Sequence, residues 1–202
     1  MSDILIKSKQ RFRTPSRVIK KREDYLSLAK FLSLNLEGKA TKYEWKNGKI
    51  LLEQKMKKEE RIIIDNICTL YMFSEKAKDG SRIMAEADID LPSVNTYRKP
   101  DAVYFTRQQI VNPNVEPSVP YFVIEVNSKS NTVNDFEDKL NDYFKAGIKT
   151  VWLILPNHRK INVYNSTKNV EIKSGSDICQ AHLENGDVFK MKVEEIFNDY
   201  TL

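Results

Sequence analysis

The sequence has few of the residues and segments that mark several classes of protein. Only 6 of its 202 residues are glycine, and no segment repeats, which excludes collagen-like and solenoid folds. The longest apolar runs, such as VWLIL at 151–155, have the length of a strand. Because a membrane helix needs about 20 consecutive apolar residues, we expect a protein that does not enter a membrane.

Cysteine and histidine are also scarce. The two cysteines, Cys68 and Cys179, lie far apart and outside any CxxC motif, and a chain of this length needs no disulfide scaffold. The basic N-terminus lacks the apolar core of a secretory signal, so we expect a reducing, cytoplasmic location. Because only His158 and His182 are present, catalysis would depend mainly on carboxylates, lysines and hydroxyls.

Positive charge is concentrated at the N-terminus. Residues 1–22 contain eight lysines and arginines and a single acidic residue, Asp3, for a formal charge of +7. The whole chain carries +5, so residues 23–202 carry −2. We interpret 1–22 as a flexible arm, which could follow a phosphate backbone or remain a solvated tail. Residues 23–202 are long enough to form one domain with its own core.

The hydrophobic pattern of this domain is typical of an α/β fold. Helical spacing of apolar residues predicts helices over about 23–36, 57–77 and 132–146. The apolar segments at 121–126 and 150–155 are typical of strands buried on both faces. Because a helix separates them, we expect these strands to pair in parallel through a right-handed crossover. The sequence therefore predicts a mixed β-sheet flanked by helices, with β-hairpins at its edges.

Residues at turns and helix ends support this assignment. The dipeptide Asn47-Gly48, within the segment 43–53, is typical of a tight β-hairpin because both residues accept a positive φ. Thr132 is the expected N-cap of the third helix, and Gly147 is expected to end it.

Two carboxylates occupy unusual places in the predicted strands. Further strands are predicted over 82–90 and 100–107, and Asp101 lies at the start of the second one. Glu125 lies inside the apolar strand at 121–126. A carboxylate buried in a strand costs several kcal/mol unless it pairs with a cation or binds a metal. Glu125 is therefore either a structural ion pair or a functional residue, and we favour the second interpretation.

A lysine in the predicted crossover helix can reach these carboxylates. Lys139 has Phe136, Leu140 and Tyr143 at positions i−3, i+1 and i+4, so it lies on or beside the face that packs against the sheet. An i,i+4 pair with Asp135 would contribute only about 0.3–0.5 kcal/mol, which does not offset the burial of a lysine among apolar side chains. We infer that Lys139 points toward the strand ends.

An aspartate, a glutamate and a lysine at strand ends favour metal-assisted hydrolysis of phosphodiester bonds. Ligands of open α/β sheets bind at the carboxyl ends of the strands. Asp101 and Glu125 would hold Mg²⁺, or alternatively Mn²⁺, together with a backbone carbonyl of Val126 or Asn127. The cation would polarise phosphate oxygens and lower the pKa of water, and Lys139 would stabilise charge in the transition state.

The order of several motifs resembles the Uma-type restriction endonuclease family, part of the PD-(D/E)XK nuclease superfamily. The resemblance covers about residues 23–200. It is carried, in this order, by the segments YEWKNGKI, RKPDAVYF, PYFVIEVNSKS, DKLNDYFKAGIKTVWLILP, KINVY and FKMKVEEIF. The resemblance implies a restriction-endonuclease-like fold and Mg²⁺-dependent cleavage of DNA.

The resemblance also implies roles for individual residues. The PD dipeptide of the superfamily motif ends at Asp101, and Glu125 matches its second acidic position. The usual lysine two residues later is Asn127 here, and Lys139 resembles a lysine that has moved to the following helix. Glu44 matches an acidic position that completes the site, and an exposed carboxylate on the hairpin is an equal alternative for this residue.

Three functions remain open at this point. The first is a Mg²⁺-dependent endodeoxyribonuclease that uses Asp101, Glu125 and Lys139; cleavage of both strands needs two active sites, which favours a C₂ homodimer. The second is a weak or inactive protein of the same fold that binds nucleic acid or regulates. Asn127 favours it, as does the lack of a histidine, common in the family, near 59–61. The third is an α/β domain whose buried charges form only an ion-pair network.

Overall fold

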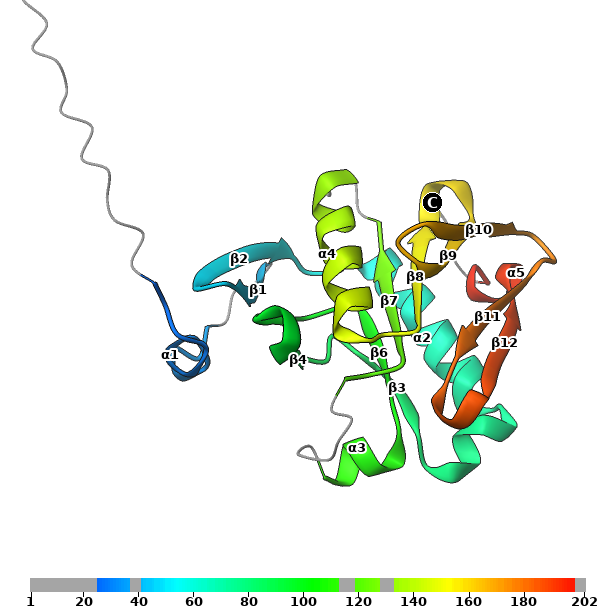
Figure 1. Ribbon diagram of the computed structural model, residues 1–202. Helices are drawn as coiled ribbons and strands as arrows, with labels where there is room; N and C mark the ends of the chain where they lie inside the picture. Colours follow the sequence, from blue (N-terminus) through cyan, green and yellow to red (C-terminus); the bar gives the residue numbers. More distant parts are fainter. Residues whose placement is uncertain (1–24, 37–40, 113–118, 128–132, 199–202) are drawn as a thin grey trace, which may run out of the picture.

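Figure 1 shows a computed structural model of the chain, which describes residues 25–36, 41–112, 119–127 and 133–198. The predicted N-terminal arm over 1–22 and the predicted N-cap Thr132 lie outside the described residues. Among the described helices, none is long and apolar enough to cross a membrane.

The centre of the fold is a mixed sheet of six strands in the order β10-β9-β8-β7-β6-β3. Its strands are β3 (Arg82–Ala85), β6 (Ala102–Phe105), β7 (Phe122–Val126), β8 (Thr150–Leu155), β9 (Lys160–Ser166) and β10 (Asn169–Ser174). Strands β7 and β8 pair in parallel and are joined through helix α4 (Val133–Ala146), whereas the other neighbours pair antiparallel. The predicted parallel pairing of these two strands across a helix and the predicted mixed α/β class are both confirmed.

A second sheet lies beside the first and has the strand order β2-β1-β5-β4. Its strands are β1 (Thr41–Lys46), β2 (Lys49–Gln54), β4 (Ile89–Leu91) and β5 (Thr96–Arg98). Strands β1 and β2 form the predicted hairpin, closed by Asn47 and Gly48, which have φ values of 50° and 84°. Two positive φ values in succession match the twist of the flanking strands, which is why an Asn-Gly pair occupies this turn.

The remaining elements cover the sheets (Figure 1). The helices are α1 (Leu28–Ser33), α2 (Lys58–Met72), α3 (Arg107–Val111) and α5 (Val193–Ile196), and strands β11 (Ile178–His182) and β12 (Val188–Lys192) form a two-stranded ribbon. Two predicted helices are shorter than expected. In the described part of the segment 23–36 only α1 is helical, and the predicted helix at 57–77 ends at Met72 before a short 3₁₀ helix over Glu75–Asp79.

The prediction of one continuous strand over 82–90 is wrong. Glu86 adopts a positive φ of 47°, and its N–H donates to the carbonyl of Asp101 at 2.9 Å. This turn sends β3 to the central sheet, where it pairs with β6, and β4 to the second sheet, where it pairs with β5. The break therefore places the second sheet against the start of β6.

Side chains of β7 alternate between two hydrophobic cores, because successive residues of a strand point to opposite faces. Ile124 and Val126 belong to the core under α2, and Val123 belongs to the core under α4. The α4 core also contains Leu140 and Tyr143 of that helix. The same alternation directs Glu125 toward α4, although it is a charged residue in a strand that is buried throughout.

The end of α4 gives the first testable prediction. Gly147 has a φ of 108°, and a Cβ atom added there would meet no atom within 4 Å, so Gly147→Ala tests backbone strain alone. We expect it to lower the free energy of unfolding by about 1–2 kcal/mol, because an alanine disfavours positive φ. Urea denaturation measures the change. The exposed neighbour Lys145 serves as a control, since Lys145→Ala should change stability by less than about 0.5 kcal/mol. Equal effects of the two variants would contradict the prediction.

Candidate active site

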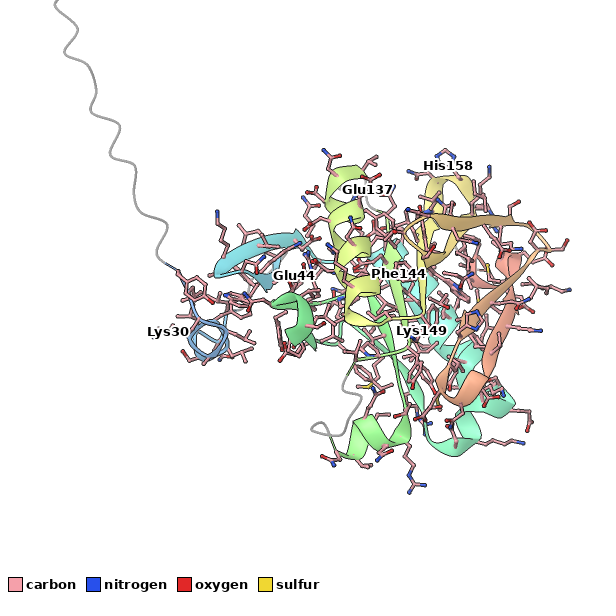
Figure 2. The ribbon with its side chains drawn as sticks, viewed as in Figure 1. Lys30, Glu44, Glu137, Phe144, Lys149 and His158 are labelled. Atoms are coloured by element: carbon pink, nitrogen blue, oxygen red, sulfur yellow. The ribbon has the colours of Figure 1, made fainter. Side chains whose placement is uncertain are left out.

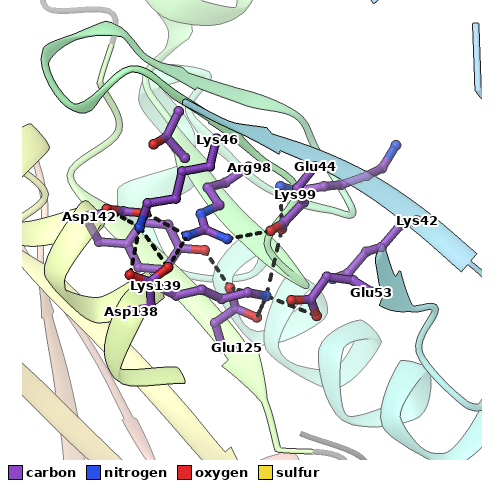
Figure 3. Close-up of polar contacts among 12 residues, drawn as sticks. Lys42, Glu44, Lys46, Glu53, Arg98, Lys99, Glu125, Asp138, Lys139 and Asp142 are labelled. Carbon is purple, nitrogen blue, oxygen red and sulfur yellow. Dashed lines mark hydrogen bonds and ion pairs between the residues drawn. The ribbon is translucent and has the colours of Figure 1, made fainter. Parts of the chain in front are cut away.

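Glu125 is the buried centre of the candidate site, with 3% of its surface exposed. The hydroxyl of Tyr143 donates a hydrogen bond of 2.5 Å to its Oε1 atom. The Lys139 Nζ atom lies 3.4 Å from each carboxylate oxygen. Both partners come from α4, which covers this face of β7, and Figure 3 shows Lys139 beside Glu125.

Asp101 lies directly before β6, which is the strand that pairs with β7. Because Ala102 pairs with Ile124 in the antiparallel register, the preceding Asp101 lies opposite Glu125. Its Oδ2 atom accepts a hydrogen bond of 2.7 Å from the N–H of Val126, and its Oδ1 atom accepts one of 2.9 Å from Lys42. The two carboxylates predicted from the sequence are thus held on adjacent strands by the sheet itself.

Lys139 joins three carboxylates. It is 3% exposed, as its place among apolar neighbours in the helix predicts. Besides Glu125, its Nζ atom lies 3.3 Å from Glu53 and 3.7 Å from Glu44. These three glutamates, and not a pair with Asp135 alone, account for the burial of the lysine.

Glu44 is fully buried, with 0% of its surface exposed, so the alternative of an exposed hairpin carboxylate is wrong. It accepts hydrogen bonds of 2.8 Å from Arg98 Nη1 and 2.9 Å from the N–H of Lys99. The hairpin does not stand free, because Trp45 of β1 pairs with Tyr97 of β5. Figure 2 shows Glu44 beside α4, on the side of the molecule that carries the hairpin.

Several charged residues that complete this arrangement are absent from the sequence-based prediction. Arg98 on β5 donates through Nη2 to Asp142 at 2.6 Å and to Asp138 at 3.1 Å. Lys46 contacts Asp138 at 2.7 Å and Asp142 at 2.9 Å. Lys42, described above with Asp101, is the third missed cation.

The sequence contains a periodic signal for some of these residues. Lys42, Glu44 and Lys46 alternate along β1 and therefore lie on one face of the strand. Asp138 and Asp142 are spaced i,i+4 and therefore lie on one face of α4. Opposite charges on one face of β1 and on one face of α4 would have indicated that the strand and the helix face each other.

Ten side chains form what we call the charge cluster. Its carboxylates are Glu44, Glu53, Asp101, Glu125, Asp138 and Asp142, and its cations are Lys42, Lys46, Arg98 and Lys139. If all ten were ionised, six carboxylates against four cations would give the charge cluster a formal charge of −2. Most of these side chains are buried, so the excess negative charge is poorly screened by water.

The pKa values of the cluster follow from this balance. Burial raises the pKa of Glu125, the charge of Lys139 opposes that rise, and the carboxylate of Asp101 adds to it. Burial would lower the pKa of Lys139, but the carboxylates of Glu125 and Glu44 outweigh burial and raise it. Lys139 therefore remains a cation at neutral pH, whereas Glu125 carries its charge less readily than an exposed glutamate.

The donors present fit a hard divalent cation. Within the residues that the structure describes, no group of three or more His, Cys, Asp or Glu side chains is arranged to hold a metal ion. Asp101 and Glu125 would therefore supply two carboxylates, and water would supply the remaining ligands, which is the coordination that Mg²⁺ prefers.

Arg98 gives the second prediction. Its replacement by methionine would leave Glu44 and Asp142 buried beside each other without their shared cation. We expect Arg98→Met to lower the free energy of unfolding by about 3–5 kcal/mol, which is typical when one partner of a buried ion pair is removed. Arg98→Lys should lose less, because it keeps the charge but not the planar fork that reaches both partners. In urea denaturation, a loss no larger than that of exposed Arg107→Met would count against this role.

Comparisons with known proteins agree with the fold and the motifs. A crystal structure described as a putative nuclease from Anabaena variabilis ATCC 29413 is similar to this chain with a TM-score of 0.69. The two share 18% sequence identity, and the similarity covers 87% of this chain and 99% of the other, which shows a common fold. A search of curated proteins found no match. The family model described as "Uma2: Putative restriction endonuclease" matches residues 22–189. The predicted family and restriction-endonuclease-like fold are thereby confirmed, and the chain belongs to the Uma2 family.

Proposed function

We propose that the protein is a metal-dependent endonuclease that hydrolyses phosphodiester bonds of DNA. The observation that carries this proposal is the meeting of Asp101 and Glu125 on adjacent strands, with the ammonium group of Lys139 directed at Glu125. The description of the family supports a nuclease and, with it, a DNA substrate. Hydrolysis of both strands would need two such sites, so a C₂ homodimer is part of the proposal.

Asp101 and Glu125 are the residues that would hold Mg²⁺ or Mn²⁺. When bound, such a cation supplies Lewis-acid polarisation of a phosphate oxygen and lowers the pKa of water. Lys42 pairs with Asp101, since its ammonium group lies 2.9 Å from Oδ1. Tyr143 fixes the orientation of the Glu125 carboxylate through its hydrogen bond to Oε1.

Lys139 is the residue that would place positive charge against the phosphate. Its side chain is held between Glu44, Glu53 and Glu125, so its ammonium group is ordered before substrate binds. A charge that is already in place costs no reorganisation during the reaction, which is why such groups are effective in stabilising transition states. Glu44 would act as a positioning residue, because it contacts both Lys139 and Arg98.

A specific observation favours a second candidate function. Glu125 has Lys139 and Tyr143 as partners, and both oxygens of Asp101 accept hydrogen bonds within the protein. The cluster can therefore exist as an ion-pair network without a metal, as in a protein of this fold that binds nucleic acid or regulates without cleaving. Metal binding and cleavage separate the two candidates.

Metal binding is the third prediction. Calorimetry with Mn²⁺ should show one site per chain in the wild-type protein, and Asp101→Asn and Glu125→Gln should each abolish it because each removes one charged oxygen ligand. Asp90 is an exposed aspartate on β4, and Asp90→Asn is the matched control that should bind as the wild type does. Circular dichroism shows whether each variant is folded. Unchanged binding by both site variants would refute the proposed ligands.

The role of Lys139 is the fourth prediction. Cleavage of supercoiled plasmid in Mg²⁺ should fall by roughly 10²-fold or more in Lys139→Met, as expected when a group that stabilises transition-state charge is lost. Lys139→Arg should restore only part of the activity, because a planar fork replaces a compact point charge. Lys145→Met, on the exposed side of the same helix, is the control and should cleave normally.

Thermal melts of the same variants separate catalysis from stability. A purely structural role predicts that Lys139→Met melts earlier while its folded fraction cleaves at the wild-type rate. That result would remove Lys139 from the proposed mechanism.

A further inference from the structure

A cleft lies on the α4 side of the central sheet, next to the charge cluster. It has a volume of about 530 Å³ and is formed between α4 and strands β8 and β9. This volume is within the range of sites that hold a small ligand. Glu137, which Figure 2 labels on α4, is an exposed residue at its rim.

Aromatic and aliphatic side chains form part of the lining of the cleft. Phe136 of α4 and Tyr164 of β9 pack against each other there, with ring centroids 5.5 Å apart and planes inclined at 54°. Leu140, Leu153 and Leu155 complete the apolar lining. Such walls favour a planar apolar surface and disfavour a phosphate group, which would lose its hydration without gaining a cation.

Three of the polar side chains in the cleft are amides. Asn127, Asn141 and Asn162 all line it. The Oδ1 atom of Asn162 is buried and has no hydrogen-bond partner among the described residues. An orphaned buried acceptor costs about 1–3 kcal/mol, so a ligand that donates a hydrogen bond there would be favoured. Amides both donate and accept, which suits the edge of a neutral heterocycle.

The cleft is lined by sequence and strand neighbours of residues in the candidate active site. Asn127 follows Glu125 by two residues on the same face of the chain, and Leu153 of β8 is the register partner of Glu125. Neighbouring strands lie about 4.8 Å apart. On α4, Leu140 in the cleft directly follows Lys139 in the charge cluster. A molecule in the cleft would therefore lie one strand away from the proposed catalytic carboxylate.

We propose that this cleft binds one nucleobase of the DNA strand whose phosphate lies at Glu125 and Lys139. The inference rests on the proposed nuclease function, because that function supplies a phosphate next to the cleft. A base turned out of its stack presents a flat face to the aromatic walls and hydrogen-bonding groups to the asparagines. The carboxylate of Glu137 at the rim accepts hydrogen bonds only, so it favours guanine, whose adjacent N1–H and N2–H₂ groups can both donate to one carboxylate.

The first experiment measures base binding without any cleavage. Saturation-transfer NMR with the four deoxynucleosides should show transfer from the protein to base protons, strongest for deoxyguanosine, and none to 2-deoxyribose alone. Asn141 is exposed at the mouth of the cleft, so Asn141→Trp should block the cleft and abolish the transfer. Lys145→Trp places the same bulk one turn further along α4, outside the cleft, and should keep it.

The second experiment uses a single-stranded oligonucleotide. We expect Asn141→Trp to weaken its binding by about tenfold, since stacking of a base on aromatic side chains contributes to affinity on this scale, while Lys145→Trp leaves it unchanged. Absence of transfer to any base, or transfer and affinity that Asn141→Trp does not alter, would overturn the proposal. Failure of the nuclease function alone would appear differently, as base binding that depends on the cleft in a protein that does not cleave plasmid.

Discussion

The burial of Glu125 in β7 is the constraint on which the rest of the structure depends. Its strand is apolar and covered on both faces, so a carboxylate there must find partners within the protein. Helix α4 supplies Lys139 and Tyr143. Asp101, held by the N–H of Val126, adds a second carboxylate that also needs a cation. Each charged partner in turn needs a neighbour of opposite charge. These pairings continue outward to side chains that contact water, and together they form the charge cluster.

The second sheet supplies several charged residues of the charge cluster. Lys42 and Glu44 on one face of β1, with Arg98 on β5, meet the residues of α4 and the start of β6. The turn at Glu86 makes this arrangement possible, since it transfers the chain from the central sheet to the second one. Without the second sheet, the buried Asp142 of α4 would lose both Lys46 and Arg98 and would carry negative charge without compensation.

The central residues of the candidate site could be selected from the sequence, and those that hold them could not. Glu125 and Lys139 are detectable because each is a charged residue among apolar residues at strand or helix spacing, which is a local pattern. Lys42 and Asp101 are 59 residues apart in the sequence, and nothing local connects them. The break at Glu86 was also hidden, because a positive φ on a residue other than glycine follows from tertiary contacts and not from propensity. Local patterns thus identified the central strand and helix, while the pairing of the two sheets required the three-dimensional structure.

Helix α4 positions both the charge cluster and the cleft. Lys139 and Tyr143, spaced i,i+4, face Glu125, while Phe136 and Leu140, with the same spacing, line the cleft. Rotation of the helix by one residue would bring Leu140 into the charge cluster in one direction and Lys139 into the apolar cleft in the other, so each half opposes movement of the other. The sugar of a nucleotide keeps its base and its phosphate at a nearly constant separation. A site that binds both groups is therefore best built on one rigid element, because sites held by helices and strands are more exact than sites held by loops.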